Sequence, residues 1–259
     1  MVFFLGLSAR SHRDNNIIMK FQSAEFNLLN CVSKTPPFKG DTGGYLNASK
    51  SEQAGTIVLN YRHMYTTKNF EHLLGTEGFS DTSLKNHFKL YEGYVNNVNT
   101  LVEKMNAIRV ERADGNDESK EESAELHRRF GWEYNGMKLH ELYFENISKE
   151  NTALDDDSNL AKEIVDRFGS MTAMEKNFKS NVGMFRGIGW VALIRRDDTL
   201  GIVWIGEHDE GLLANSEIIL IMDVFEHAYI TDYEINRAEY IDTFWKNIDW
   251  NICVKRFDK

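Results

Sequence analysis

The sequence predicts an α+β fold, with an N-terminal α-hairpin followed by an α/β domain that holds a three-stranded, mainly antiparallel sheet. Apolar residues recur at three- and four-residue steps through residues 80–107, which is the period of an amphipathic helix. A second helical pattern, over residues 134–147, follows a polar connector, as in an αα-hairpin. The period then shortens, and three short runs rich in β-branched residues indicate strands.

The chain of 259 residues is expected to divide into residues 1–64, 65–155 and 156–259. Residues 1–64 hold seven Lys or Arg against four Asp or Glu, so they carry +3, whereas the whole chain carries −10. Both prolines and a loose run rich in Gly and Ser also lie there, so we expect a disordered extension. Its first residues lack the basic region of a secretory signal, although a signal or transit role, or translation from a later start such as Met64, stays an alternative.

Composition narrows the class of protein. The chain is 42% hydrophobic and 27% charged, which is typical of a globular protein. No apolar run approaches the ~18 residues of a membrane span, so we do not expect an integral membrane protein. The net charge of −10 argues against binding to nucleic acid or to an anionic membrane. Cys31 and Cys253 are too few for a disulfide framework, which indicates a reducing, cytoplasmic location.

The first predicted helix begins at Ser80–Asp81–Thr82, which offers an N-cap, and ends around Ala107. Its apolar stripe consists of Leu84, Phe88, Tyr91, Val95, Val98 and Val102. Residues 110–129 are polar and charged, which predicts a solvated loop or a helix extension. The second helix then carries His140 on its apolar side.

The second half of the chain mixes helices and strands. In order, the predicted elements are two helices over 157–185 divided at Gly169–Ser170, two hairpin strands (191–196 and 200–206) around a turn at Asp197–Asp198, a buried strand (217–224) and a helical segment (225–250).

Side chains able to bind a metal ion gather where these elements are expected to meet. Asp223 ends the third strand and His227 follows four residues later, so the two can converge on one cation if the chain turns between them. His140 lies on the second helix, and His87 shares a face of the first helix with Tyr94. Three histidines and one aspartate suit a first-row transition metal with one open position. Taken singly, each histidine is more often a hydrogen-bonded core residue.

Six sequence motifs occur in a fixed order over nearly all of residues 65–259. They are HFKLYEGYVNNVN (87–99), MKLHELYF (137–144), FGSMTAMEKNF (168–178), GIGWVAL (187–193), DVFEHAYITDY (223–233) and YIDTFWKNIDW (240–250). In this order they resemble the iron/manganese superoxide dismutase family, whose metal-binding signature is DxWEHAYYxDY. The resemblance implies the family's fold and its metal chemistry.

Three of the family's four metal ligands have a counterpart here: Asp223, His227 and His140. For the fourth, counting back from Tyr94 without a gap gives Asn86, whereas a one-residue deletion gives His87. We favour His87, because imidazole is a common ligand of iron or manganese and a carboxamide is rare. Helix geometry agrees, since His87 and Tyr94 differ by about 20° around the axis, and Asn86 and Tyr94 by about 80°.

The resemblance also implies roles for residues around the metal. Tyr94 matches the gateway tyrosine, which hydrogen-bonds toward metal-bound solvent, and Trp190 matches the aromatic residue that walls the active site. Lys89 and Arg237 match basic residues of the substrate funnel. Glu226 matches the glutamate that reaches the ligand histidine of the other subunit in the family dimer. The family's histidine pair in the first helix is missing near Leu90 and Tyr91, and its interface tyrosine is Ile230 here. We therefore expect an interface of similar shape but lower polarity.

The family's active-site glutamine has no direct counterpart. The family presents this glutamine to metal-bound solvent from the second helix or from the second hairpin strand. Here the helix position is Gly136 and the hairpin position is His208, which matches neither the usual manganese nor the usual iron pattern. We expect His208 to orient that solvent together with Tyr94. The alternative is that His208 is an exposed residue of a polar loop.

The resemblance implies an enzyme that converts superoxide to oxygen and hydrogen peroxide by redox cycling of one Fe or Mn ion per subunit. The superoxide anion is the expected substrate, and a homodimer or dimer of dimers is the expected assembly. Lys89 and Arg237 would focus the anion despite the net negative charge. Two alternatives stay open: a catalytically degenerate dismutase-fold protein with a structural or interaction role, and a metal-binding member with another oxidase or peroxidase activity.

Overall fold

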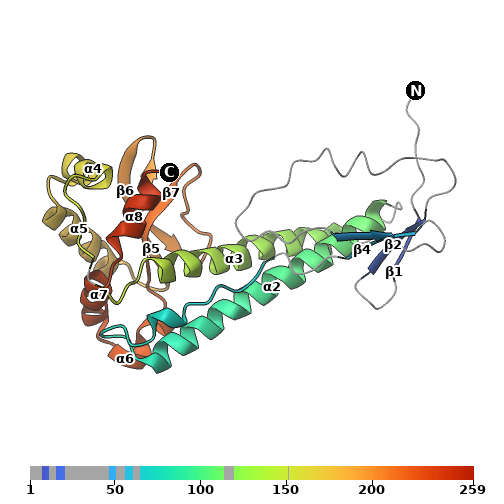
Figure 1. Ribbon diagram of the computed structural model, residues 1–259, viewed down its shortest axis with the longest axis horizontal. Coiled ribbons are helices and arrows are strands. Elements are labelled where there is room, and N and C mark those ends of the chain that lie inside the picture. The colour runs from blue at the N-terminus through green and yellow to red at the C-terminus, as the bar shows by residue number, and fades with distance from the viewer. Residues whose placement is uncertain are drawn as a thin grey trace. The chain divides into compact units, whose positions relative to one another are not determined.

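The computed structural model of the protein describes residues 8–11, 16–20, 47–50, 56–60, 65–113, 120–150 and 152–259 (Figure 1). The chain divides into two units, one of residues 1–66 and 95–130 and one of residues 67–94 and 131–259. Within residues 1–64, four short strands pair in the order β1-β2-β4-β3: β1 (Ser8–Ser11), β2 (Asn16–Lys20), β3 (Asn47–Lys50) and β4 (Thr56–Asn60). The remainder of this segment lies outside the described residues, and its expected disorder stays a prediction.

The two long helices of the predicted hairpin are both present and both longer than expected: α2 (Asp81–Ala113) and α3 (Lys120–Glu145) (Figure 1). The polar stretch 110–129 extends both helices on either side of residues 114–119, which lie outside the described residues. Its Glu, Lys and Arg residues are good helix formers that stay solvated in a helix. No helix among the described residues has a stretch apolar and long enough to cross a membrane.

Two predicted helix boundaries, the start at Ser80 and the break at Gly169–Ser170, are confirmed by their caps. The Ser80 hydroxyl accepts a hydrogen bond from the Ser83 N–H at 3.1 Å, as an N-cap does at the start of α2. Gly169, with φ of 85°, ends one helix in the left-handed conformation, and Ser170 caps the next by accepting from the Ala173 N–H at 3.0 Å. The two helices divided here are α4 (Asn159–Phe168) and α5 (Met171–Met184).

The three predicted strands form an antiparallel sheet of order β6-β5-β7: β5 (Gly189–Arg196), β6 (Thr199–Gly206) and β7 (Glu217–Asp223). Asp197 and Asp198 have positive φ values of 49° and 60°. A two-residue turn with positive φ at both positions has the twist that suits the two antiparallel strands it joins. The first six residues of the central strand β5 are buried. Trp190 on β5 pairs with Asp223 at the end of β7. The predicted α+β fold is therefore confirmed.

The helical segment expected after β7 is broken into separate pieces: η2 (Glu226–Ala228), α6 (Ile230–Tyr233), α7 (Arg237–Lys246) and α8 (Trp250–Phe257). Glu234 has φ of 51°, which a right-handed helix cannot accommodate. The Asn236 side chain then caps α7. A further 3-10 helix, η1 (Glu71–Leu73), precedes α2.

Asn146, fully buried directly after α3, joins three elements through its side chain. Its Oδ1 accepts from the Ile221 N–H of β7 at 3.0 Å and from Arg256 of α8 at 3.4 Å, and its Nδ2 donates to the Tyr143 carbonyl at 2.8 Å. This side chain therefore ties the second helix to the sheet that carries Asp223.

Replacing Asn146 with Ala should lower the free energy of unfolding by about 2–3 kcal/mol, because the buried Ile221 N–H loses its acceptor. Denaturant unfolding monitored by circular dichroism measures the change. Asn96→Ala is the matched control, since Asn96 is exposed on α2 and should change stability by less than about 0.5 kcal/mol. Equal effects of the two substitutions would contradict the assigned role of Asn146.

Candidate metal centre

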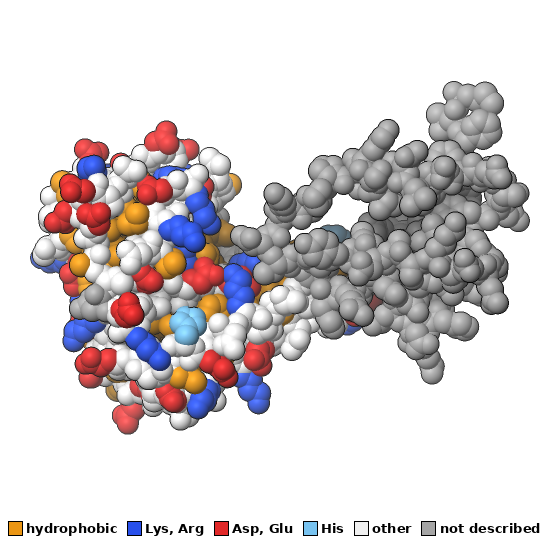
Figure 2. All heavy atoms as spheres, viewed as in Figure 1, with side chains coloured by type: hydrophobic (Ala, Val, Ile, Leu, Met, Phe, Trp, Pro, Cys, Tyr) orange, Lys and Arg blue, Asp and Glu red, His pale blue; other side chains and the backbone are white. Residues whose placement is uncertain are grey.

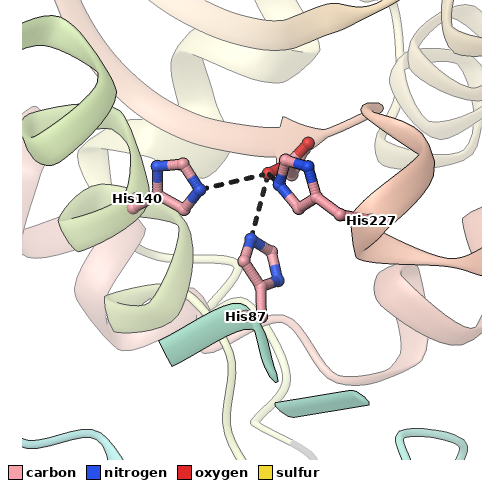
Figure 3. A group of neighbouring side chains, drawn as sticks. His87, His140 and His227 are labelled. Carbon is pink, nitrogen blue, oxygen red and sulfur yellow. Dashed lines mark hydrogen bonds and ion pairs between the residues drawn. The ribbon is translucent and has the colours of Figure 1, made fainter. Parts of the chain in front are cut away.

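Four side chains from four elements converge on one point: His87 of α2, His140 of α3, Asp223 of β7 and His227 of η2. Figure 3 shows the three imidazoles turned toward one carboxylate oxygen. The Asp223 Oδ2 atom lies 3.1 Å from His87 Nε2, 3.2 Å from His227 Nε2 and 3.8 Å from His140 Nε2. All four potential ligand atoms lie within 4.8 Å of one another. The cluster thus has the donor types and the spacing of a site that could hold one transition-metal ion.

Helix α2 places His87, and not Asn86, in this cluster. His87 lies on the buried face of the helix and is 3% exposed, with its ring 4.8 Å from that of Phe144. Asn86 is exposed. The seven-residue step from His87 to Tyr94 lies within continuous helix, so both side chains occupy one face.

His140 has the geometry of a prepared metal ligand. Its Nδ1 lies 2.5 Å from the carbonyl oxygen of Gly136, which can only accept, so Nδ1 carries the hydrogen and Nε2 carries the lone pair. Nε2 is buried and has no hydrogen-bond partner among the described residues. Burial, together with His87, holds the pKa of His140 well below its usual value, so the ring stays neutral. A buried acceptor without a partner is costly, and a metal ion at this point would satisfy it.

Asp223 is the anionic centre of the cluster. Its Oδ1 accepts from the Phe225 N–H at 2.8 Å, which directs Oδ2 toward the imidazoles. Burial raises the pKa of this carboxyl, but His227 and His87 outweigh burial and hold it below its usual value. Burial likewise lowers the pKa of His87, whereas the Asp223 charge raises the pKa of His227 against burial. A metal ion at this point would therefore compete with a proton mainly at His227.

Of two tyrosines that the sequence did not single out, Tyr240 holds the backbone of Asp223 and Tyr143 holds Tyr240. The Tyr240 hydroxyl donates to the Asp223 carbonyl at 2.7 Å, so at the 3.1 Å contact between the two hydroxyls Tyr143 is the donor. Both are fully buried. They lie inside the motifs MKLHELYF and YIDTFWKNIDW, but helical periodicity alone assigns them only to the core.

His208 is fully buried, so the exposed-loop alternative is wrong. Glu207, with φ of 47°, and the paired backbone bonds between Gly206 and Glu210 turn the chain tightly and direct His208 inward. His208 Nε2 lies 2.8 Å from the Tyr94 hydroxyl, whose ring lies 5.0 Å from that of His140. The predicted wall residue Trp190 is also buried and donates from Nε1 to His208 Nδ1 at 3.1 Å.

Gly136 leaves the space that Tyr94 occupies. A Cβ atom at Gly136 would lie 2.6 Å from two ring atoms of Tyr94, so no side chain fits there without displacement. A glutamine at position 136 would therefore overlap the Tyr94 ring in its present place. Trp132, which no sequence motif singled out, has its ring 4.5 Å from that of His208 and donates from Nε1 to Glu207 at 3.0 Å.

The other predicted site residues lie outside the cluster. Lys89 is exposed on α2, and Glu226 is exposed on η2 beside His227. The Arg237 guanidinium donates to the carbonyls of Val182 and Phe185 at 2.9 and 3.1 Å, so it is occupied with the C-terminal end of α5. This arrangement gives Arg237 a role in holding a helix end, in addition to its expected position near substrate.

Comparison with known proteins points to one family. The family model for the C-terminal domain of iron/manganese superoxide dismutases matches residues 156–256. The chain is 30% identical over 184 residues to a superoxide dismutase [Fe] of Aquifex pyrophilus, covering 71% of this chain and 86% of that protein. It is 29% identical over 175 residues to a superoxide dismutase [Fe] of Methanothermobacter marburgensis, covering 66% and 84%. A superoxide dismutase [Mn] 2 of Haloferax volcanii is 29% identical over 173 residues, covering 67% and 83%.

Gly136→Ala should destabilise the protein by about 1–3 kcal/mol, because the new methyl group overlaps the Tyr94 ring. Gly131→Ala on the same helix is the matched control. No atom lies within 4 Å of a Cβ at Gly131, so this change should stabilise the helix by up to about 1 kcal/mol. Thermal and denaturant unfolding of both variants measure the difference, and a neutral Gly136→Ala would be inconsistent with the close contact.

Proposed function

The chain belongs to the iron/manganese superoxide dismutase family, and we propose that it is an active dismutase with His87, His140, Asp223 and His227 as its metal ligands. The observation that carries the proposal is the convergence of these four side chains, with a buried His140 Nε2 that has no hydrogen-bond partner among the described residues. A bound iron or manganese ion would supply the electron exchange by which one superoxide is oxidised to oxygen and another is reduced to peroxide. One similar protein is named a superoxide dismutase [Fe] and another a superoxide dismutase [Mn], so the proposal includes both ions.

The protein residues have separate tasks in this reaction. Asp223, His87, His140 and His227 would supply the donor atoms to a bound ion, and burial keeps Asp223, His87 and His140 from being solvated by bulk water. Reduction of superoxide to peroxide consumes protons, and the Tyr94 hydroxyl, hydrogen-bonded to His208 beside His140, can hold a proton next to the ligands. Trp190, which is fully buried, donates a hydrogen bond to the other ring nitrogen of His208.

Attraction of an anionic substrate depends on local charge. The chain carries −10, but acidic and basic side chains are intermixed over the described part of the face in Figure 2. Exposed Lys89 lies about 200° around the α2 axis from His87, on the opposite face of the helix, so the local positive charge at the site would be that of a bound metal cation. Local positive charge of this kind can outweigh the net charge of a distant surface.

We further propose a homodimer, or a dimer of dimers, in the cytoplasm. Exposed Glu226 lies next to His227, as expected of a carboxylate that reaches the corresponding histidine of a second subunit. Ile230 is 50% exposed and Leu90 44% exposed, which agrees with an interface of low polarity. The low cysteine content supports a reducing compartment.

The degenerate-homologue alternative rested mainly on Asn86 as a lost ligand. Since Asn86 is exposed and His87 lies in the cluster, that alternative has lost its main support. An oxidase or peroxidase activity rests only on the unusual His208 and is tested by assaying peroxide consumption alongside superoxide loss.

His87→Ala should reduce bound iron or manganese at least about tenfold and abolish superoxide turnover, because it removes one of the four donors. Asn86→Ala should leave both nearly intact, since Asn86 is exposed on the same helix. Metal content by mass spectrometry and a superoxide assay on purified protein measure the two effects. Full metal loading of the His87→Ala variant would refute the ligand assignment.

Glu226→Ala should weaken self-association and lower metal retention together, because the proposed carboxylate contact joins the two subunits at a ligand histidine. Glu150→Ala, another exposed acidic residue, serves as the control and should change neither. Light scattering and metal analysis provide the measurements. A fully loaded, active monomer of the unmodified chain would rule out the proposed role of Glu226.

A further inference from the structure

The hydrogen bond between Trp190 and His208 can run in only one direction. An indole N–H is a donor and cannot accept. Trp190 Nε1 lies 3.1 Å from His208 Nδ1, so Nδ1 must present its lone pair and the ring hydrogen must lie on Nε2. The contact thus selects one of the two neutral tautomers of His208.

The selected tautomer determines the direction of the next hydrogen bond. His208 Nε2 lies 2.8 Å from the Tyr94 hydroxyl oxygen, and with its hydrogen on Nε2 it donates to that oxygen. Turning the imidazole over would place ring carbons at both contacts and lose both bonds, so the ring orientation is fixed as well. Tyr94 is therefore the acceptor at this contact, and its own hydrogen is directed away from His208.

Packing holds the His208 ring in this orientation. The Phe225 ring stacks on it at 5.0 Å, and the Trp132 ring meets it edge-on at 4.5 Å. Trp132 is itself held by its hydrogen bond to Glu207, the neighbour of His208. Because His208 is fully buried, its ring cannot reorient without moving these neighbours.

We propose that Trp190 is a positioning residue that sets the hydrogen-bond polarity at Tyr94 by acting through His208. A glutamine at position 208 could likewise accept from Trp190 through its amide oxygen, but only the imidazole has two tautomers between which this donor must select. Because His208 Nδ1 accepts from Trp190, the imidazole presents only its Nε2–H to Tyr94. The consequence for turnover rests on the proposed function, whereas the tautomer depends only on contacts between protein groups.

The test is the tautomer of His208 in the full-length chain labelled with 15N-histidine. Two-bond 1H–15N correlations distinguish a ring nitrogen that carries hydrogen from one that carries a lone pair. Spectra are recorded without metal and with diamagnetic Zn2+, and the His208 signals are those missing from a His208→Gln variant. We expect the Nε2–H tautomer in the unmodified chain. The Nδ1–H tautomer there would overturn the proposal.

Substitutions identify which neighbour selects the tautomer. Trp190→Phe keeps a ring but removes the donor, so the Nδ1–H tautomer should become populated; Trp204→Phe, on β6 and 38% exposed, is the matched control and should change nothing. Tyr94→Phe keeps the Trp190 contact and should keep the Nε2–H tautomer. If Tyr94→Phe switches the tautomer, or Trp190→Phe leaves it unchanged, Trp190 does not set the polarity. Loss of dismutase activity alone, with the expected tautomers, would count against the proposed function and not against this inference.

Discussion

The carboxylate of Asp223, buried at the end of a central sheet, is the constraint on which the rest of the site depends. A buried charge is costly unless it is paired and hydrogen-bonded. Here Oδ1 accepts a hydrogen bond from the Phe225 N–H, and Oδ2 faces His87, His140 and His227. These three histidines come from three different helices. The residues that meet at this one carboxylate are thus brought together by the paired strands β5 and β7 and the helices α2 and α3.

The surroundings of Asp223 keep the histidines available as donors. Aromatic rings enclose His87 and His140, and burial lowers the pKa of both, so their lone pairs are not taken up by protons. The Gly136 carbonyl and the Tyr240 hydroxyl fix the orientation of His140 and of the Asp223 backbone. An ion bound here would take its binding energy partly from relieving this buried polar cluster, which couples metal binding to the stability of the fold.

Local sequence signals predicted the elements, whereas the four residues of the cluster were expected mainly from the resemblance to a known family. The Gly169–Ser170 break and the Asp197–Asp198 turn depend on neighbouring residues only, and helix angles favoured His87 over Asn86. The inward turn of His208 depends on the positive φ of Glu207, and the roles of Trp132 and Tyr240 depend on residues 75 and 17 positions away. Such contacts leave no periodic trace in the sequence. The helices were longer than expected because charged residues suit a solvated helix as well as a loop.

The proposed function requires four protein ligands to hold a single redox-active ion beside the Tyr94–His208 pair. Anomalous X-ray diffraction at the iron and manganese absorption edges, on crystals of the full-length chain, tests it most directly. It predicts one peak per subunit, bonded to His87 Nε2, His140 Nε2, an oxygen of Asp223 and His227 Nε2. A peak that excludes His87, or an ion bound elsewhere with this cluster collapsed on itself, would contradict it.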